Sequence, residues 1–152
     1  MDLTIAPKVV FEKYPRVDHS GHIDPTDQGS IDSMFWEPIA LPMVIPAGRR
    51  ILASTVETVE VPRGAVGLIC LRSTWARLGL IAPPTVADPG FHGTLTMEVF
   101  NGSRFDIKIE QGMKVWSISY LTLAVDEPLY QGRYQGQTGL QLPKALKRES
   151  AA

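Results

Sequence analysis

Prolines and glycines punctuate the whole chain. Twelve prolines and thirteen glycines occur among its 152 residues, and they interrupt each apolar run after a few positions. Proline breaks the interior of a helix, and both residue types favour turns. Long helices are therefore disfavoured, and short strands joined by turns are expected. Such a pattern predicts an all-β sandwich or barrel.

About ten short strands are expected from runs of apolar, β-branched or alternating residues. Eight of these runs lie at residues 3–5, 9–11, 39–45, 50–61, 66–71, 94–100, 105–109 and 114–123. In residues 94–100, Leu95, Met97 and Val99 share one face of the strand, and Glu98 lies on the other face with two threonines.

Residues 73–78 are the one good helical candidate. Ser73 or Thr74 can cap its first turn by accepting from a backbone N–H. Gly79 can end it in a left-handed conformation. Farther along the chain, Asn101-Gly102 is a strong hairpin signal between two strands.

Length and charge exclude several classes of protein. A chain of this length predicts one domain over residues 1–152. The net charge of -1 gives no field that would attract nucleic acid or an anionic membrane, and no apolar stretch is long enough to cross a bilayer. The first residues lack the pattern of a secretory signal. Cys70 is the single cysteine, so no internal disulfide can form, and a cytoplasmic location is expected.

The helical candidate carries a possible anion site. Ser73 and Arg77 lie four residues apart and would share a helix face. Arg72 flanks the helix start, where free N–H groups and the dipole favour an anion such as a polyphosphate. The alternative is a capping serine beside two surface arginines, and these residues alone favour that alternative.

Two carboxylates follow the helical candidate. Asp88 lies in the turn sequence Asp-Pro-Gly and could accept a hydrogen bond from a sugar hydroxyl, or could only shape the turn. Glu98 lies in mid-strand, where glutamate is poorly suited. It is a candidate general acid and base if its face lines a pocket, and an ordinary surface residue if that face meets solvent.

Two segments lack any strand or helix pattern. Residues 15–32 mix Asp, His, Ser, Gly and Pro and predict an exposed loop. The tail, which begins at Pro128, carries Arg133, Tyr134 and Gln137 between spaced glycines. It could close over a ligand as a lid, or it could be a disordered terminus. Its end, residues 144–152, is expected to fray.

No established metal or cofactor motif is present. The loop group Asp18, His19, His22 and Asp24 matches no metal-ligand spacing, so no metal site is expected there. Cys70 lies in an apolar run and is expected to be a small buried residue. The chain lacks the zinc-deaminase signature, the P-loop and the dinucleotide fingerprint.

Taken together, the motifs resemble the dCTP deaminase branch of the dUTPase superfamily. The resemblance rests on residues 72–80 (RSTWARLGL), 88–93 (DPGFHG), 95–101 (LTMEVFN) and 133–139 (RYQGQTG). Residues 2–4 and the strands before Arg72 match more weakly. Glu98, Phe91 and the composition of the tail separate the chain from the dUTPases, which usually carry an apolar residue, a tyrosine and a Gly/Ser-rich tail there.

The resemblance implies a homotrimer of distorted jelly-roll subunits with active sites shared between chains. It implies a magnesium-bound deoxynucleoside triphosphate as ligand (dCTP, dUTP or dTTP) and no zinc. The implied catalytic residues are Glu98, which shuttles protons, and Ser73 and Arg77, which orient the water. The implied substrate-binding residues are Arg72, Thr74, Arg133 and Gln137 around the phosphates, Asp88 at the 3'-hydroxyl, and Tyr134.

The expected reaction is zinc-independent deamination of dCTP to dUTP and ammonia, with possible further cleavage to dUMP and pyrophosphate. Residues 81–87, which form the wall beside the base in the family, look about two residues shorter than usual and contain Pro83-Pro84. Two alternatives therefore stay open. One is a dUTPase or another pyrimidine nucleotide pyrophosphatase, and the other is a trimeric nucleotide-binding protein without turnover.

Overall fold

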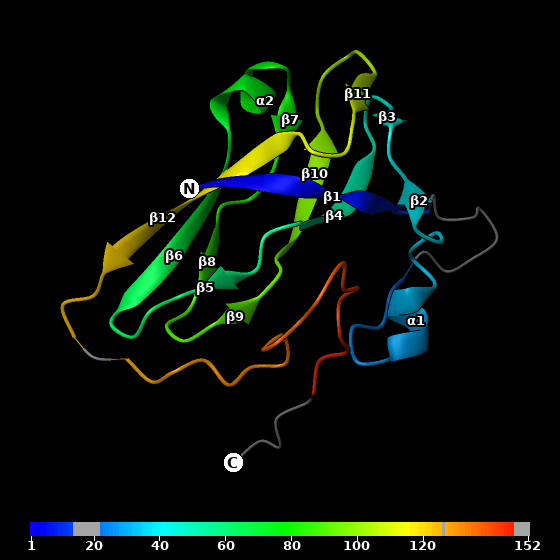
Figure 1. Ribbon diagram of the computed structural model, residues 1–152. Helices are drawn as coiled ribbons and strands as arrows, with labels where there is room; N and C mark the ends of the chain where they lie inside the picture. Colours follow the sequence, from blue (N-terminus) through cyan, green and yellow to red (C-terminus); the bar gives the residue numbers. More distant parts are fainter. Residues whose placement is uncertain (14–21, 126, 148–152) are drawn as a thin grey trace.

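The computed structural model describes residues 1–13, 22–125 and 127–147, and these residues are built mainly of antiparallel strands (Figure 1). The main sheet has eight strands. In spatial order they are β7 (Leu80–Ile81), β10 (Thr96–Asn101), β4 (Arg50–Thr55), β1 (Asp2–Phe11), β12 (Lys114–Thr122), β6 (Ala65–Leu71) and β8 (Thr85–Ala87), with β2 (Ile39–Ala40) paired to β1.

Two small sheets and two short helices complete the described elements. The small sheets pair β3 (Met43–Ile45) with β11 (Ile107–Ile109) and β5 (Val59–Glu60) with β9 (His92–Gly93). The helices are α1 (Gln28–Asp32) and α2 (Ser73–Arg77). The all-β prediction is confirmed, with a second helix that the sequence pattern did not predict.

One strand connects the two halves of the main sheet. The start of β1 pairs with β12, and its end pairs with β4. The register of the β1–β4 pair shifts between Ile5 and Val9, around Pro7, which cannot donate to a ladder. The two short strands predicted on either side of Pro7 are thus one bent strand.

A large apolar core lies against the main sheet. Trp116, Leu3, Ile5 and Ile69 are among its largest fully buried members. In β10 and just before it, Leu95, Met97 and Val99 are buried, while Thr96 and Glu98 are partly exposed. The predicted alternation of this strand is confirmed, and it leaves Glu98 on the face away from the core.

The expected exposed loop contains α1. Asp27 caps this helix, because its carboxylate accepts from the Ser30 N–H at 2.7 Å. Five residues are too few to show a helical period in the sequence, which explains the wrong prediction. Asp18 and His19 lie outside the described residues.

The predicted cap of α2 is wrong, and its predicted end is correct. Arg72 occupies the N-cap position, and no side chain caps the helix. Gly79 has a φ of 98°, a conformation that other residues rarely adopt. A Cβ on this glycine would lie 2.6 Å from the Ser103 Cβ, so position 79 also requires the absence of a side chain.

The predicted hairpin at Asn101-Gly102 is also wrong, since β11 pairs with β3 and not with β10. Asn101 is fully buried, and its amide nitrogen donates to the carbonyls of Ile45 and Phe105 at 2.8 and 2.9 Å. The asparagine therefore connects three segments. Phe105 was expected to share a strand face with Ile107 and Ile109, which are buried, but Phe105 itself is 78% exposed.

The tail packs back onto the domain. Beyond β12, it runs past β9 and ends beside α1 (Figure 1, orange to red). Backbone N–H groups of the tail donate to Pro89, His92 and Pro25, the last of these from Leu146. The disordered alternative and the expected fraying are therefore wrong for residues 127–147. In the described part of the chain, no helix has the length and apolar character needed to span a membrane.

Candidate active site

A cavity of about 290 Å³ lies between β10, the turn after β8 and the tail. This volume is at the lower end of the range for small-molecule sites, about 300–1,000 Å³. Its polar lining residues come from all three segments. They are Thr85, Asp88, Thr96, Glu98, Tyr130, Tyr134, Gln137 and Gln141.

Strand pairing aims Glu98 into this cavity. In the β10–β4 ladder Glu98 lies opposite Leu52, and Thr96 lies opposite Ser54. Residues two apart on a strand share a face, so Thr96 and Glu98 both line the cavity, as Leu52 does. The Glu98 carboxylate makes no hydrogen bond or ion pair with any described residue, which leaves both oxygens available to a ligand.

The turn after β8 places Asp88 at the cavity. The Phe91 N–H donates to the Asp88 carbonyl at 3.0 Å, and Gly90 has a φ of 78°. Phe91 is buried and meets the Tyr130 ring edge to face, with centroids 5.7 Å apart. This packing anchors the turn, so that the exposed Asp88 side chain has a defined position.

The tail closes the other side of the cavity through Gln137. The Thr94 N–H donates to the Gln137 carbonyl at 3.0 Å, and the Gln137 amide donates back to the Thr94 carbonyl at 2.6 Å. The Gln137 Oε1 atom is buried and has no hydrogen-bond partner. Among the described contacts between Thr94 and Gln137, this oxygen is the one acceptor that is still available to a ligand.

Arg133 does not line the cavity. Its guanidinium donates to the backbone carbonyls of Lys144, at 3.1 Å, and Ala145. Tyr134 lines the cavity, and its hydroxyl accepts from the Lys144 N–H at 3.0 Å. The Lys144 ammonium lies 5.2 Å from the centre of the Tyr134 ring. Arg133 therefore holds the tail in shape here.

The residues of α2 lie apart from the cavity. Ser73, Thr74 and Arg77 are exposed, and no residue of α2 lines the cavity. The Trp75 indole N–H donates to the Lys114 carbonyl at 2.9 Å and fixes the helix to β12. Within one chain, the structure does not bring Ser73 and Arg77 together with Glu98.

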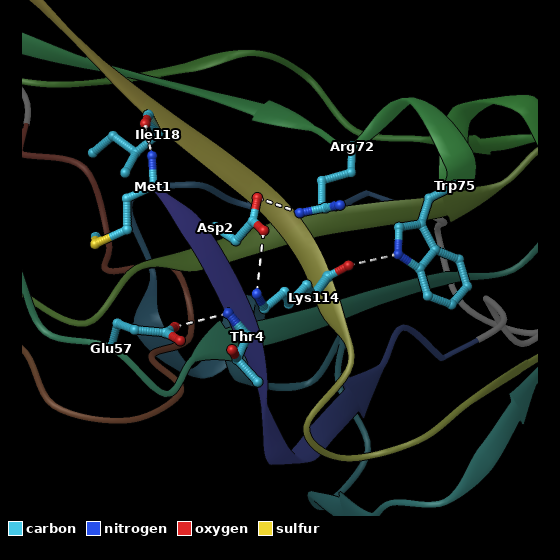
Figure 2. Close-up of polar contacts among 8 residues, drawn as sticks. All are labelled: Met1, Asp2, Thr4, Glu57, Arg72, Trp75, Lys114 and Ile118. Carbon is cyan, nitrogen blue, oxygen red and sulfur yellow. Dashed lines mark hydrogen bonds and ion pairs between the residues drawn. The ribbon is translucent and has the colours of Figure 1, made fainter.

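Arg72 forms an ion pair at the start of β1. Its guanidinium contacts one oxygen of Asp2, and the Lys114 ammonium lies 3.4 Å from the other (Figure 2). The hydrogen bond from Arg72, and then that from Lys114, hold the pKa of Asp2 below its ordinary value of 3.8. No sequence pattern predicts this pair, because Asp2 and Arg72 are far apart in the chain.

Two further contacts hold the start of β1 in place. The Met1 ammonium donates to the Ile118 carbonyl at 2.9 Å, and the Thr4 N–H donates to the Glu57 carboxylate at 2.7 Å (Figure 2). The Asp2 carboxylate, which pairs with Arg72, therefore lies on a strand that is held on both sides of Asp2. Among the described residues, no group of three or more His, Cys, Asp or Glu side chains is placed to hold a metal ion.

Sequence reasoning missed several cavity residues. Thr85, Thr96, Tyr130 and Gln141 line the cavity but were not singled out. Thr96 could have been found, because it lies two residues before Glu98 on the same strand face. Gln141 and Tyr130 could not, because their position depends on the path of the tail.

The fold defines a class that includes solved nucleotide enzymes. The structure is similar to a dCTP deaminase from Agrobacterium tumefaciens (TM-score 0.61, 17% identity, 79% of this chain and 38% of that chain). It is also similar to EIAV dUTPase (TM-score 0.52, 18% identity, 88% of this chain and 98% of that chain). At these identities the likeness shows a dUTPase-like fold.

The sequence comparison narrows this class. The model of the dCTP deaminase-like family matches residues 1–123, and the chain belongs to that family. It is 42% identical to the dCTP deaminase of Pyrobaculum neutrophilum over 127 residues, which are 84% of this chain and 72% of the relative. It is 41% identical to that of Pyrobaculum aerophilum over 151 residues, 98% of this chain and 82% of the relative.

Proposed function

We propose that the chain is a dCTP deaminase, which converts dCTP and water to dUTP and ammonia. The observation that carries the proposal is the Glu98 carboxylate, which lies in the cavity opposite the tail without a described partner. Relatives named dCTP deaminase support the proposal. Two of them, from Pyrobaculum species, match this chain over 72% and 82% of their own length.

In this proposal Glu98 moves protons at the base. It takes a proton from the attacking water and delivers it to ring N3, which makes C4 electrophilic as the C4–O bond forms. The proton of the new C4 hydroxyl then passes through Glu98 to the exocyclic nitrogen, the C4–N bond breaks, ammonia leaves, and the C4 carbonyl of dUTP forms. A positioned carboxylate and a bound water can carry both steps.

The complete site is formed between chains of a homotrimer. The exposed face of α2 supports this part of the proposal, because Ser73 and Arg77 have no access to the cavity of their own chain. Arg77 of a neighbouring chain would stabilise charge near the base, and Ser73 beside it would orient the water. In a homotrimer the chains meet head to tail in a closed ring, so each chain would face the next across one such site.

The substrate enters as the magnesium complex of the triphosphate. The ion arrives with the nucleotide and offsets phosphate charge, and the chain supplies donors. The proposed phosphate ligands are Arg72, Thr74, Arg133 and Gln137, with Tyr134 beside them, and Asp88 accepts from the 3'-hydroxyl. Gln137 would bind phosphate through its amide nitrogen, which in this structure donates to the Thr94 carbonyl. Arg133 would have to exchange its contacts with the Lys144 and Ala145 carbonyls for phosphate oxygens.

The test is a nucleotide panel in which ammonia and pyrophosphate are measured separately. Purified protein, dCTP and magnesium are expected to yield ammonia and dUTP in equal amounts. Pyrophosphate from dUTP with no ammonia from dCTP would contradict the proposal and favour a dUTPase. Tight nucleotide binding without either product would favour a binding protein.

A further inference from the structure

The end of the tail is attached to α1 by one glutamine. The Gln28 Oε1 atom accepts from the Ala145 N–H at 2.8 Å, and the Gln28 Nε2 atom donates to the Pro143 carbonyl at 3.1 Å. The same nitrogen donates to the Asp32 carboxylate at 2.8 Å, which orients the amide. A single exposed side chain thus satisfies two backbone groups of the tail.

An apolar contact lies beside this attachment. Val10, Ile31, Phe35 and Leu52 form a small buried cluster between α1 and the main sheet. Three residues of the tail pack against this cluster. They are Leu140, Leu142 and Ala145.

This cluster is continuous with the Glu98 cavity. Leu52 belongs to the cluster and also lines the cavity. Leu142 and Pro143, which adjoin the Gln28 attachment, line the cavity as well. The position of α1 is therefore coupled by direct contact to the wall that faces Glu98.

The tail is attached to its own chain along its whole described length. Tyr130 donates to the Pro89 carbonyl at 2.7 Å, and Gly136 donates to the His92 carbonyl at 2.8 Å. Gln141 donates to the Thr96 hydroxyl at 3.0 Å, four residues before the contact of Ala145. Contacts recur every few residues, so one chain supplies both Glu98 and the cover above it.

We propose that α1 is a latch that fastens the tail over the cavity of its own chain, with Gln28 as the positioning residue. The expected kinetic effect of this latch rests on the proposed function. The expected effect on the order of the tail rests on the described contacts alone. Gln28 acts through residues 141–145 and does not touch the substrate. The tail then works within one chain, whereas α2 works between chains.

The first experiment compares Gln28→Ala with Gln111→Ala in the full-length protein. Gln111 is an exposed glutamine in the turn before β12, and its side chain makes no hydrogen bond with the described part of the tail, so it is a matched control. Hydrogen exchange of residues 141–146 is expected to quicken about threefold to tenfold in Gln28→Ala, because two hydrogen bonds are lost. The control is expected to match the wild type.

Kinetics separates a positioning role from a general loss of stability. The KM for dCTP is expected to rise severalfold in Gln28→Ala while kcat changes less, because the cover forms less often over the substrate. Gln28→Glu, which keeps the acceptor for Ala145, is expected to lie between Gln28→Ala and the wild type. Unchanged exchange of the tail in Gln28→Ala overturns the latch whether or not the protein deaminates dCTP.

A mixing experiment tests whether the tail serves its own chain. Glu98→Gln chains are unfolded and refolded together with Gln137→Ala chains, so that the two assort in the same oligomers. A cover within the chain predicts activity no higher than the average of the two parents. Activity above that average, or full turnover of Gln137→Ala alone, overturns the proposal.

Discussion

The predicted catalytic residues lie in two regions that are stabilised differently. Glu98 lies in the cavity, and Ser73 and Arg77 lie on the exposed face of α2. Glu98 is fixed by β10, which is hydrogen-bonded to β4 on one side and to β7 on the other. The five residues of α2 are too few for a stable helix alone, and contacts of its neighbours hold it. The sheet therefore holds the Glu98 carboxylate, whereas a short helix outside the sheet holds Arg77.

This difference indicates how one chain can carry a site that it cannot complete. Its cavity offers carboxylates and amides but no cation among its lining residues. The face of α2 offers Arg77 and two hydroxyls but no cavity. Each surface supplies what the other lacks, so an assembly that joined the two surfaces would form the site proposed above.

The largest expected effect is the loss of the carboxylate at position 98. Glu98→Gln keeps the shape of the side chain but cannot carry protons, so kcat for ammonia release should fall about 10²- to 10⁴-fold. Nucleotide affinity, measured by calorimetry, should stay near that of the wild type. Full turnover in this variant would refute the assigned role.

The second effect tests whether the two surfaces meet across chains. Glu98→Gln and Arg77→Ala are each expected to be inactive, but refolding them together should restore roughly a quarter of the wild-type activity, since random assortment gives that share of intact sites. Activity is measured as ammonia released. No recovery in verified mixed oligomers would mean that the two residues belong to different functions.

Several features of the cavity and of α2 could be predicted from the sequence. The features that could not be predicted share a physical cause. The alternation of residues 94–100 sets the face of Glu98, and Gly79 marks the end of α2, because strand and helix periods are local properties. The sequence could not show that α2 and the cavity are separate. That separation depends on the order of strands in the sheet, which no local pattern encodes.

The tail and Asn101 show the same limit. By composition the tail could equally be disordered, and its order comes from long-range partners such as Thr94 and Gln28. Asn101-Gly102 has hairpin chemistry, yet burial of the asparagine overrides it. The wrong predictions therefore occur where tertiary contacts decide the local conformation.

A third prediction concerns the glycine that ends α2. Gly79→Ala should lower the free energy of unfolding by about 2 kcal/mol or more, because a Cβ there has an unfavourable φ and meets Ser103. Gly112→Ala is the control, since its φ of 82° is similar but its Cβ would meet nothing within 4 Å. It should cost about 1 kcal/mol. Urea midpoints measure both, and equal midpoints would contradict the contact with Ser103.

The smallest expected effect is that of the Asp2 pair. The pKa of Asp2 is lowered, so its contribution to stability is present above pH 3.8 and is lost as the pH falls through the lower folded value. Asp2→Asn should therefore be slightly less stable than the wild type at pH 7 and equal to it once the pH is well below the folded pKa of Asp2. Thermal melts over this range check the sign, and a difference that grows in acid would contradict the pairing.

The burial of Asn101 also affects chemical durability. In flexible peptides the asparagine of an Asn-Gly pair deamidates quickly, because the glycine nitrogen attacks the carbonyl of the asparagine side chain and expels ammonia. Here the Gly102 nitrogen donates to the Gly79 carbonyl at 3.0 Å, and the asparagine amide is held by two carbonyls. The folded protein should resist this reaction, and unfolded protein should undergo it. A slow background of ammonia in stored samples would then report denatured chains rather than enzymatic turnover.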